Sequence, residues 1–244
     1  MSGTWSVLKR ELKGYFATPL AYVFLVIFLF FASVLTFRNG FYEMREASLR
    51  AFFVNMPVLF LFLVPAISMR LWAEERRTNS IEFLLTLPLT PLQAVLGKFF
   101  AAWAVLALAL ALTFPVAITV AYLGNPDWGP VILGYIGSLL LAGAFLAVGS
   151  LFSTVTKNQV IAFVLAVAVS ALLVFAGNPT TLEYLSRVFP MGLVAAVESF
   201  SFLARFESLQ RGVLELRDVA FFVLLTAGLL WANVVVLEER RAAG

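Results

Sequence analysis

The residue types that could do chemistry are scarce in this sequence, and those present exclude most catalytic sites. The chain of 244 residues contains no cysteine and no histidine, which removes disulfides, thiol chemistry and the metal or proton-relay sites built on histidine. A phosphate-binding loop would need a glycine five residues before Gly97-Lys98, but Leu92 stands there. We therefore expect a chain that is not an enzyme, holds no metal or cofactor itself and binds no nucleic acid.

One charged segment, residues 70–98, separates two apolar runs and is the main candidate for a binding function. It begins with charged residues and continues as an apolar stretch that closes at Pro88. Apolar side chains in a charged connection need a surface to cover them. Composition alone favours a solvated helix end followed by a helix that lies on the membrane surface. The alternative is a short helix that docks in a groove on a soluble partner, with its charged residues at the rim, and the family resemblance described below favours this alternative. The candidate docking residues are Glu74, Glu75, Arg76, Arg77, Ile81, Glu82, Phe83, Leu84, Leu85, Leu87 and Pro88.

A second candidate is the N-terminal segment, residues 1–18, which is amphipathic. Apolar residues recur there at three- or four-residue spacing and basic residues occupy the other faces. This pattern predicts a helix along the membrane surface, with a solvated tail as the alternative. The residues assigned to this interfacial helix are Trp5, Leu8, Lys9, Arg10, Leu12, Lys13, Tyr15 and Phe16.

Six apolar runs position these two segments, and none of the 17 Lys and Arg or 14 Asp and Glu falls inside a run. The sequence is 62% hydrophobic with a mean hydropathy of +0.97, more apolar than a soluble domain can bury. A transmembrane helix needs about 17–25 apolar residues. We therefore expect one all-α membrane domain over residues 1–244, with six transmembrane helices at residues 19–37, 53–69, 99–123, 131–152, 160–176 and 219–237.

The distribution of basic residues favours an orientation with both termini in the cytoplasm. Residues 70–98 are then inside and residues 177–218 outside. In this outer connection, Pro190-Met191-Gly192 breaks helical continuity. An apolar stripe follows on a helix, and we expect one or two short outer helices, interfacial or half-inserted, before the last span. The stripe consists of Leu193, Val197, Phe200, Leu203 and Phe206.

The apolar runs also bear on how a transport process would be driven. Ion-coupled carriers generally place an Asp, Glu, Lys, Arg or His residue at membrane depth, and the six runs contain none of these. Energy for transport would then enter from outside the bilayer. A secondary carrier or channel that uses only carbonyls and hydroxyls is the alternative, and a membrane anchor for an ATPase without transport is a third reading.

Three stretches resemble ABC type-2 exporter permeases. Glu75-Arg76-Arg77-Thr78-Asn79-Ser80-Ile81-Glu82-Phe83-Leu84-Leu85-Thr86-Leu87-Pro88, followed by Gly97-Lys98, is similar to their signature between the second and third spans. Asn79-Ser80 stands where the family usually has Gly-Thr. Residues 10–23 and 206–218 resemble the gliding-motility branch of the family.

The resemblance implies that ATP hydrolysis takes place on a separate chain. Residues 74–88 would form a coupling helix seated on a separate ATPase, which would hold ATP and Mg²⁺, and residues 5–16 the cytoplasmic interfacial helix. It implies a complex with two copies of an ABC ATP-binding subunit and a second permease chain, so that the permeases form a homodimer or a heterodimer of homologues. A periplasmic or membrane accessory subunit is a further partner that the family allows. The expected location is the bacterial inner membrane, as a multi-pass protein that exports a substrate the sequence does not identify.

Overall fold

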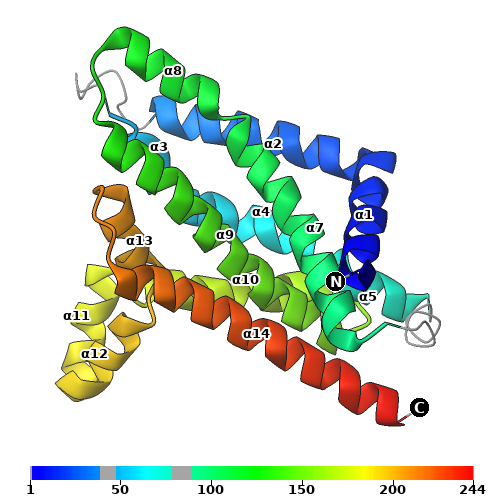
Figure 1. Ribbon diagram of the computed structural model, residues 1–244. Coiled ribbons are helices and arrows are strands. Elements are labelled where there is room, and N and C mark those ends of the chain that lie inside the picture. The colour runs from blue at the N-terminus through cyan, green and yellow to red at the C-terminus, as the bar shows by residue number, and fades with distance from the viewer. Residues whose placement is uncertain (1, 39–47, 79–88, 244) are drawn as a thin grey trace.

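The computed structural model describes residues 2–38, 48–78 and 89–243, and within these residues the chain forms helices and no strand (Figure 1). The first helix, α1 (Ser2–Ala17), meets α2 (Pro19–Arg38) at a sharp joint. Thr18 lies at this joint, and its hydroxyl donates to the carbonyls of Gly14 and Tyr15, both at 3.3 Å. Because Pro19 has no N–H to continue the ladder of α1, the chain changes direction here.

Three consecutive helices cover the second apolar run and the start of the charged segment that follows it. Helix α3 (Arg50–Val54) and helix α4 (Met56–Ser68) are separated at Asn55, and α5 (Arg70–Arg77) follows α4 after Met69. Helix α4 and helix α5 together form a stretch of 22 residues that is long and apolar enough to cross a membrane. The helix therefore continues past residue 69, where the sequence placed the end of the span.

The third run forms α7 (Pro91–Ala111) and α8 (Phe114–Leu123), which together make an apolar stretch of 33 residues. Thr90 begins α7 with a capping box: its hydroxyl accepts from the Gln93 amide, and the Gln93 side chain accepts from the Thr90 amide. At about 1.5 Å per residue, 33 residues exceed the roughly 30 Å hydrocarbon core. The predicted span at 99–123 is thus the later part of a longer helical pair that is interrupted at residues 112–113.

Helix α9 (Trp128–Val155) is the centre of the bundle (Figure 1) and packs against α4, α5, α7, α10, α13 and α14. Its second half is buried almost without interruption. Small residues permit this: a Cβ on Gly149 would lie 1.8 Å from Oγ of Ser68, and a Cβ on Gly134 would lie 2.4 Å from the Phe53 ring. Close helix packing through small residues is typical of membrane proteins.

Helix α10 (Gln159–Phe175) is followed by α11 (Pro179–Val188), and the two axes are bent by 82°. The Asn178 side chain accepts a hydrogen bond of 3.0 Å from the Thr180 amide, so Asn178 starts α11 in the new direction. Helix α10 has 17 residues and counts as a span only together with α11.

The apolar stripe predicted on a helix at residues 193–206 is divided between two helices. Helix α12 (Met191–Ser199) ends before Phe200, and Ser201 begins α13 (Phe202–Gln210) by accepting from the Ala204 amide at 3.3 Å. The prediction of a continuous helix through residue 201 was therefore wrong, because the serine caps a new helix. Only α13 turns into the bundle, where Phe202 and Phe206 are fully buried.

Helix α14 (Leu216–Ala243) closes the bundle against α7 and α9, and both termini lie at the same end of the molecule (Figure 1). We call this the termini end. Within the described part of the chain, five helical stretches are long and apolar enough to cross a membrane, and the bent pair α10 and α11 would make six. Large apolar side chains on α2, α10 and α14 point outward, as expected of surfaces that face lipid. The protein is an all-α, multi-pass membrane protein.

Candidate functional site

The predicted docking segment begins within the described part of the chain, at the end of α5. Glu74, Glu75, Arg76 and Arg77 form the last turn of this helix, and the backbone N–H of Thr78 bonds to the Glu74 carbonyl at 3.0 Å. The remaining predicted docking residues lie outside the described residues, so their role stays a prediction. They are Ile81, Glu82, Phe83, Leu84, Leu85, Leu87 and Pro88.

Helix α5 is held on α9 by a serine that bonds to its backbone. The Ser153 hydroxyl accepts from the amides of Trp72 and Ala73, both at 3.0 Å, and donates to the Met69 carbonyl at 2.8 Å. These groups lie at the break between α4 and α5, where the helical ladder is interrupted and buried backbone polar groups need partners. The start of α5 is therefore fixed by a tertiary contact.

The four charged residues in the last turn of α5 differ in their surroundings. Arg76 is 7% exposed and donates from Nη1 to the Thr154 carbonyl of α9 at 2.6 Å. Glu74 accepts from Arg77 at 2.9 Å and also from Gln159 at the start of α10. Only Arg77 has a largely exposed side chain, at 65%. The sequence placed all of these charges at the rim of a partner surface, whereas the structure pairs most of them within the chain.

A cluster of four charged residues joins α1, α5 and α7 at the termini end. Lys98 Nζ lies 2.9 Å from Oε1 of Glu75 and 3.2 Å from Oε1 of Glu11. Arg10 Nη2 lies 3.0 Å from the same Glu11 oxygen and 3.8 Å from Oε1 of Glu75. We call Arg10, Glu11, Glu75 and Lys98 the ion cluster. It brings together Arg10, which the sequence assigned to the interfacial helix, and Lys98, which is not among the docking residues predicted from the sequence.

Three members of the ion cluster, Glu11, Glu75 and Lys98, are largely shielded from water, whereas Arg10 lies at its exposed edge. The Lys98 side chain is 3% exposed, and its ammonium group lies 5.1 Å from the centre of the buried Trp72 ring. Burial alone would raise the pKa of Glu11, but the adjacent Lys98 and Arg10 outweigh burial and lower this pKa below its usual value. Glu11 is therefore a carboxylate at neutral pH. A shielded set of mutually paired charges resists separation, because removing one member leaves another buried without its partner.

Helix α1 packs on α7 through residues that the sequence pattern only partly identified. Val7 is 3% exposed and lies against Gly97, where an added Cβ would approach to 2.7 Å. The predicted apolar stripe is half-buried, except that Trp5 is 57% exposed. Lys9, Arg10 and Lys13 are exposed, and Leu8, Leu12, Tyr15 and Phe16 are half-buried. Val7 was missed because its position depends on the small residue opposite it.

A buried polar group between α9 and α14 was also missed. Asn233 is fully buried; its Nδ2 donates to the Ser150 hydroxyl at 2.7 Å, and its Oδ1 accepts from the Thr154 hydroxyl at 2.6 Å. Thr154 is also the residue whose carbonyl binds Arg76. The signal in the sequence was an amide inside an apolar run, since such residues commonly bond across helices. The last span is thus connected through α9 to the end of α5.

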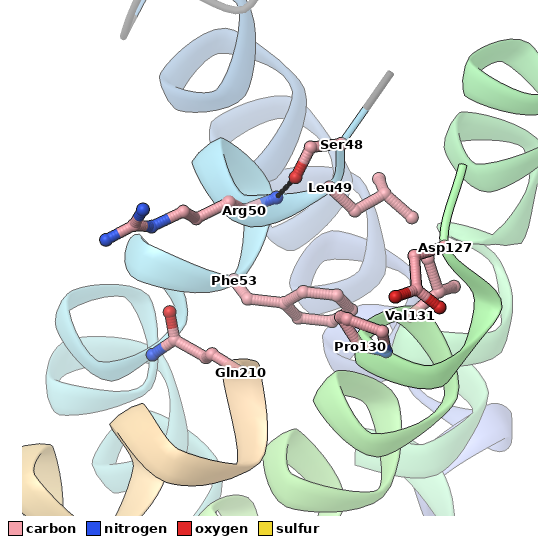
Figure 2. Close-up of a pocket in the computed structure, with 8 residues that line it drawn as sticks. All are labelled: Ser48, Leu49, Arg50, Phe53, Asp127, Pro130, Val131 and Gln210. Carbon is pink, nitrogen blue, oxygen red and sulfur yellow. Dashed lines mark hydrogen bonds between the residues drawn. The ribbon is translucent and has the colours of Figure 1, made fainter. Parts of the chain in front are cut away.

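The opposite end of the bundle carries a separate polar region. Asp218, at the start of α14, is 2% exposed, pairs with Arg205 at 3.2 Å and accepts from Ser208. Nearby, a cavity of about 80 Å³ opens between α3, α9 and α13. Figure 2 shows Arg50 and Gln210 on one side of the Phe53 ring in this cavity and Asp127 on the other. No group of acidic residues within the described ranges could hold a metal ion.

The termini end thus joins α1, α5 and α7 through the ion cluster. Among proteins with curated descriptions, none matches the sequence closely enough to show a relationship. The family model of the ABC-2 family transporter proteins matches residues 33–237. That range includes the described helices from α3 to α13 and leaves out α1. The chain therefore belongs to the ABC-2 transporter family and is a transmembrane subunit of an ABC transporter.

Proposed function

We propose that this chain is the permease of an ATP-driven exporter in the bacterial inner membrane, with both termini in the cytoplasm. ABC-2 permeases pair with an ABC ATP-binding subunit, which supports ATP hydrolysis in a partner chain. Two such subunits and a second permease, identical or homologous, would complete the transporter. The six apolar runs carry no Asp, Glu, Lys, Arg or His, which favours an external source of energy over a coupling ion.

The observation that carries this proposal is the ion cluster. Along the sequence, residues 79–88 connect Thr78, which follows α5, to Leu89, just before α7. The ion cluster joins α5 to α7 through Glu75 and Lys98, and joins both to α1 through Glu11. A displacement of residues 79–88 by a partner would therefore move three helices together. Because α5 continues α4, and α7 is itself a span, the displacement would reach the membrane.

A pull-down of the ATP-binding subunit tests this function. Leu84→Asp places a charge in the predicted apolar docking face and should abolish retention of the ATP-binding subunit or uncouple its hydrolysis from export. Burying one leucine contributes roughly 1.5–3 kcal/mol, and burying an unpaired carboxylate costs more. Leu214→Asp is the matched control, since Leu214 is 60% exposed and belongs to the connection between α13 and α14, which lies at the end of the bundle opposite the termini (Figure 1).

Two further readouts separate the parts of the proposal. Topology reporters fused after Thr78 and Lys157 should report the cytoplasm, and one fused after Asn125 the outside. Retention of an ATP-binding subunit without ATP-dependent export would indicate a membrane anchor instead of an exporter. Undiminished binding and coupled export by Leu84→Asp would mean that the partner docks elsewhere. Membership of the gliding-motility branch, drawn from residues 10–23 and 206–218, stays a prediction.

A further inference from the structure

A second feature of the termini end is a cavity of about 160 Å³ beside the joint between α1 and α2. Gly14, Tyr15 and Thr18 line it from the joint, and Arg70 and Leu71 from the start of α5. Its volume is close to that of an engineered protein cavity that holds benzene. The cavity can hold a chemical group of that size, and any larger molecule must extend out of it.

The charge in this cavity is positive and lacks a counter-ion within the described residues. Arg70 is half-buried, and within the described part of the chain its guanidinium forms no ion pair or hydrogen bond. Glu11 also lines the cavity, but Lys98 and Arg10 already neutralise it. An arginine in such surroundings favours a planar or tetrahedral oxyanion that accepts several of its N–H groups.

Tyr15 adds a second donor beside the arginine. Burial and the nearby Glu11 carboxylate raise the pKa of Tyr15 far above its usual value, although Arg70 acts in the opposite direction. The phenol therefore stays protonated at neutral pH and can donate a hydrogen bond. The Thr18 hydroxyl is already used, since it donates to carbonyls of α1. The polar side of the cavity thus offers donors for an anion.

The other side of the cavity is apolar and leads to the lipid-facing surface. Leu20 and Leu71 line it, and Tyr22 and Val23 on the next turn of α2 are more than half exposed. If α1 lies along the membrane surface as the sequence predicts, the joint at Thr18 is at the depth of the lipid headgroups. A ligand with an anionic head and an apolar body matches this surface better than a free anion.

We propose that this cavity binds the phosphate group of an anionic phospholipid of the cytoplasmic leaflet. Arg70 and Tyr15 hold the phosphate, and the acyl chains lie along the start of α2. The leaflet follows from the proposed orientation, but binding itself does not depend on docking of an ATP-binding subunit. A lipid held here would contact α1, α2 and α5 together.

The test uses the full chain, purified in detergent and delipidated, with phosphatidylglycerol added and bound lipid counted by native mass spectrometry. Arg70→Ala should lower retention of this lipid about tenfold, equivalent to about 1.4 kcal/mol. Gly14→Leu should do the same by filling the cavity, since a Cβ at Gly14 meets nothing within 4 Å and packing is left intact. The matched controls are Lys13→Ala, which removes one exposed charge from α1, and Gly192→Leu, which also adds a side chain in open space.

Both controls should retain the lipid within about twofold of the unsubstituted chain, and inorganic phosphate in millimolar excess should not displace it. The proposal would be overturned if Arg70→Ala and Gly14→Leu retained as much lipid as the unsubstituted chain. An equal loss in Lys13→Ala would overturn it too, because the lipid would then respond to the general charge of α1. Displacement by inorganic phosphate would show a simple anion site. Topology reporters and the ATP-binding pull-down are independent of these outcomes, so failure here is distinguishable from failure of the proposed function.

Discussion

Replacing Lys98 by methionine is the sharpest perturbation of the ion cluster, because it removes the charge and keeps a chain of similar length. Removing one partner of a buried ion pair typically costs about 3–5 kcal/mol. Here Glu11 and Glu75 keep 20% and 19% of their side-chain surface exposed, and Arg10 remains close to both. We therefore expect a loss of about 2 kcal/mol, below the fully buried range.

The assay is thermal unfolding of the purified chain in detergent. A loss of about 2 kcal/mol corresponds to a fall in melting temperature of roughly 4–8 °C for a chain of this size. Arg77→Met is the control, since Arg77 pairs with Glu74 on the exposed surface, where such a pair contributes about 0–1 kcal/mol.

A double-mutant cycle with Glu11→Gln measures whether Lys98 acts through its charge. Residues that share an ion pair should show a coupling of about 0.5–3 kcal/mol. The reasoning is refuted if Lys98→Met melts within about 1 °C of the unsubstituted chain, or if Arg77→Met falls by the same amount.

Two other predictions concern stability. Because the pKa of Glu11 is lowered in the folded chain, the contribution of Glu11 to stability is fully present above the unfolded pKa of about 4.5 and is lost as the pH falls through the lower folded pKa. The stability advantage of the unsubstituted chain over Glu11→Gln should therefore be constant near neutral pH and shrink only in acid. Melting temperatures measured across pH check this, and an advantage that shrinks above pH 5 would contradict it. Gly149→Ala should lower the free energy of unfolding by about 1–3 kcal/mol, since the added Cβ would lie 2.7 Å from Cβ of Ser68. Gly228→Ala is the control: an added Cβ there meets nothing within 4 Å, so this variant should melt no lower than the unsubstituted chain. Equal melting temperatures of the two variants would show that α4 and α9 can separate freely.

The sequence determined the features that depend on local composition. Long apolar runs without charge must become membrane helices, because only a helix satisfies all backbone polar groups within one segment in lipid. The all-α membrane fold and the family therefore followed from the runs and from the motif at residues 75–98, and both are confirmed. The amphipathic pattern of residues 5–16 likewise predicted a helix, which is α1.

The tertiary structure decided how residues far apart in the chain come together. No periodicity could place Glu11, Glu75 and Lys98 in one ion cluster, or show that Ser153 holds the start of α5. Such contacts depend on how closely helices approach, and this is set by small residues such as Gly97 and Gly149 opposite specific side chains. Pairing with a distant partner also explains why Arg76, which the sequence placed at an exposed rim, is buried: a charge leaves water only where a partner on another helix compensates for its lost hydration.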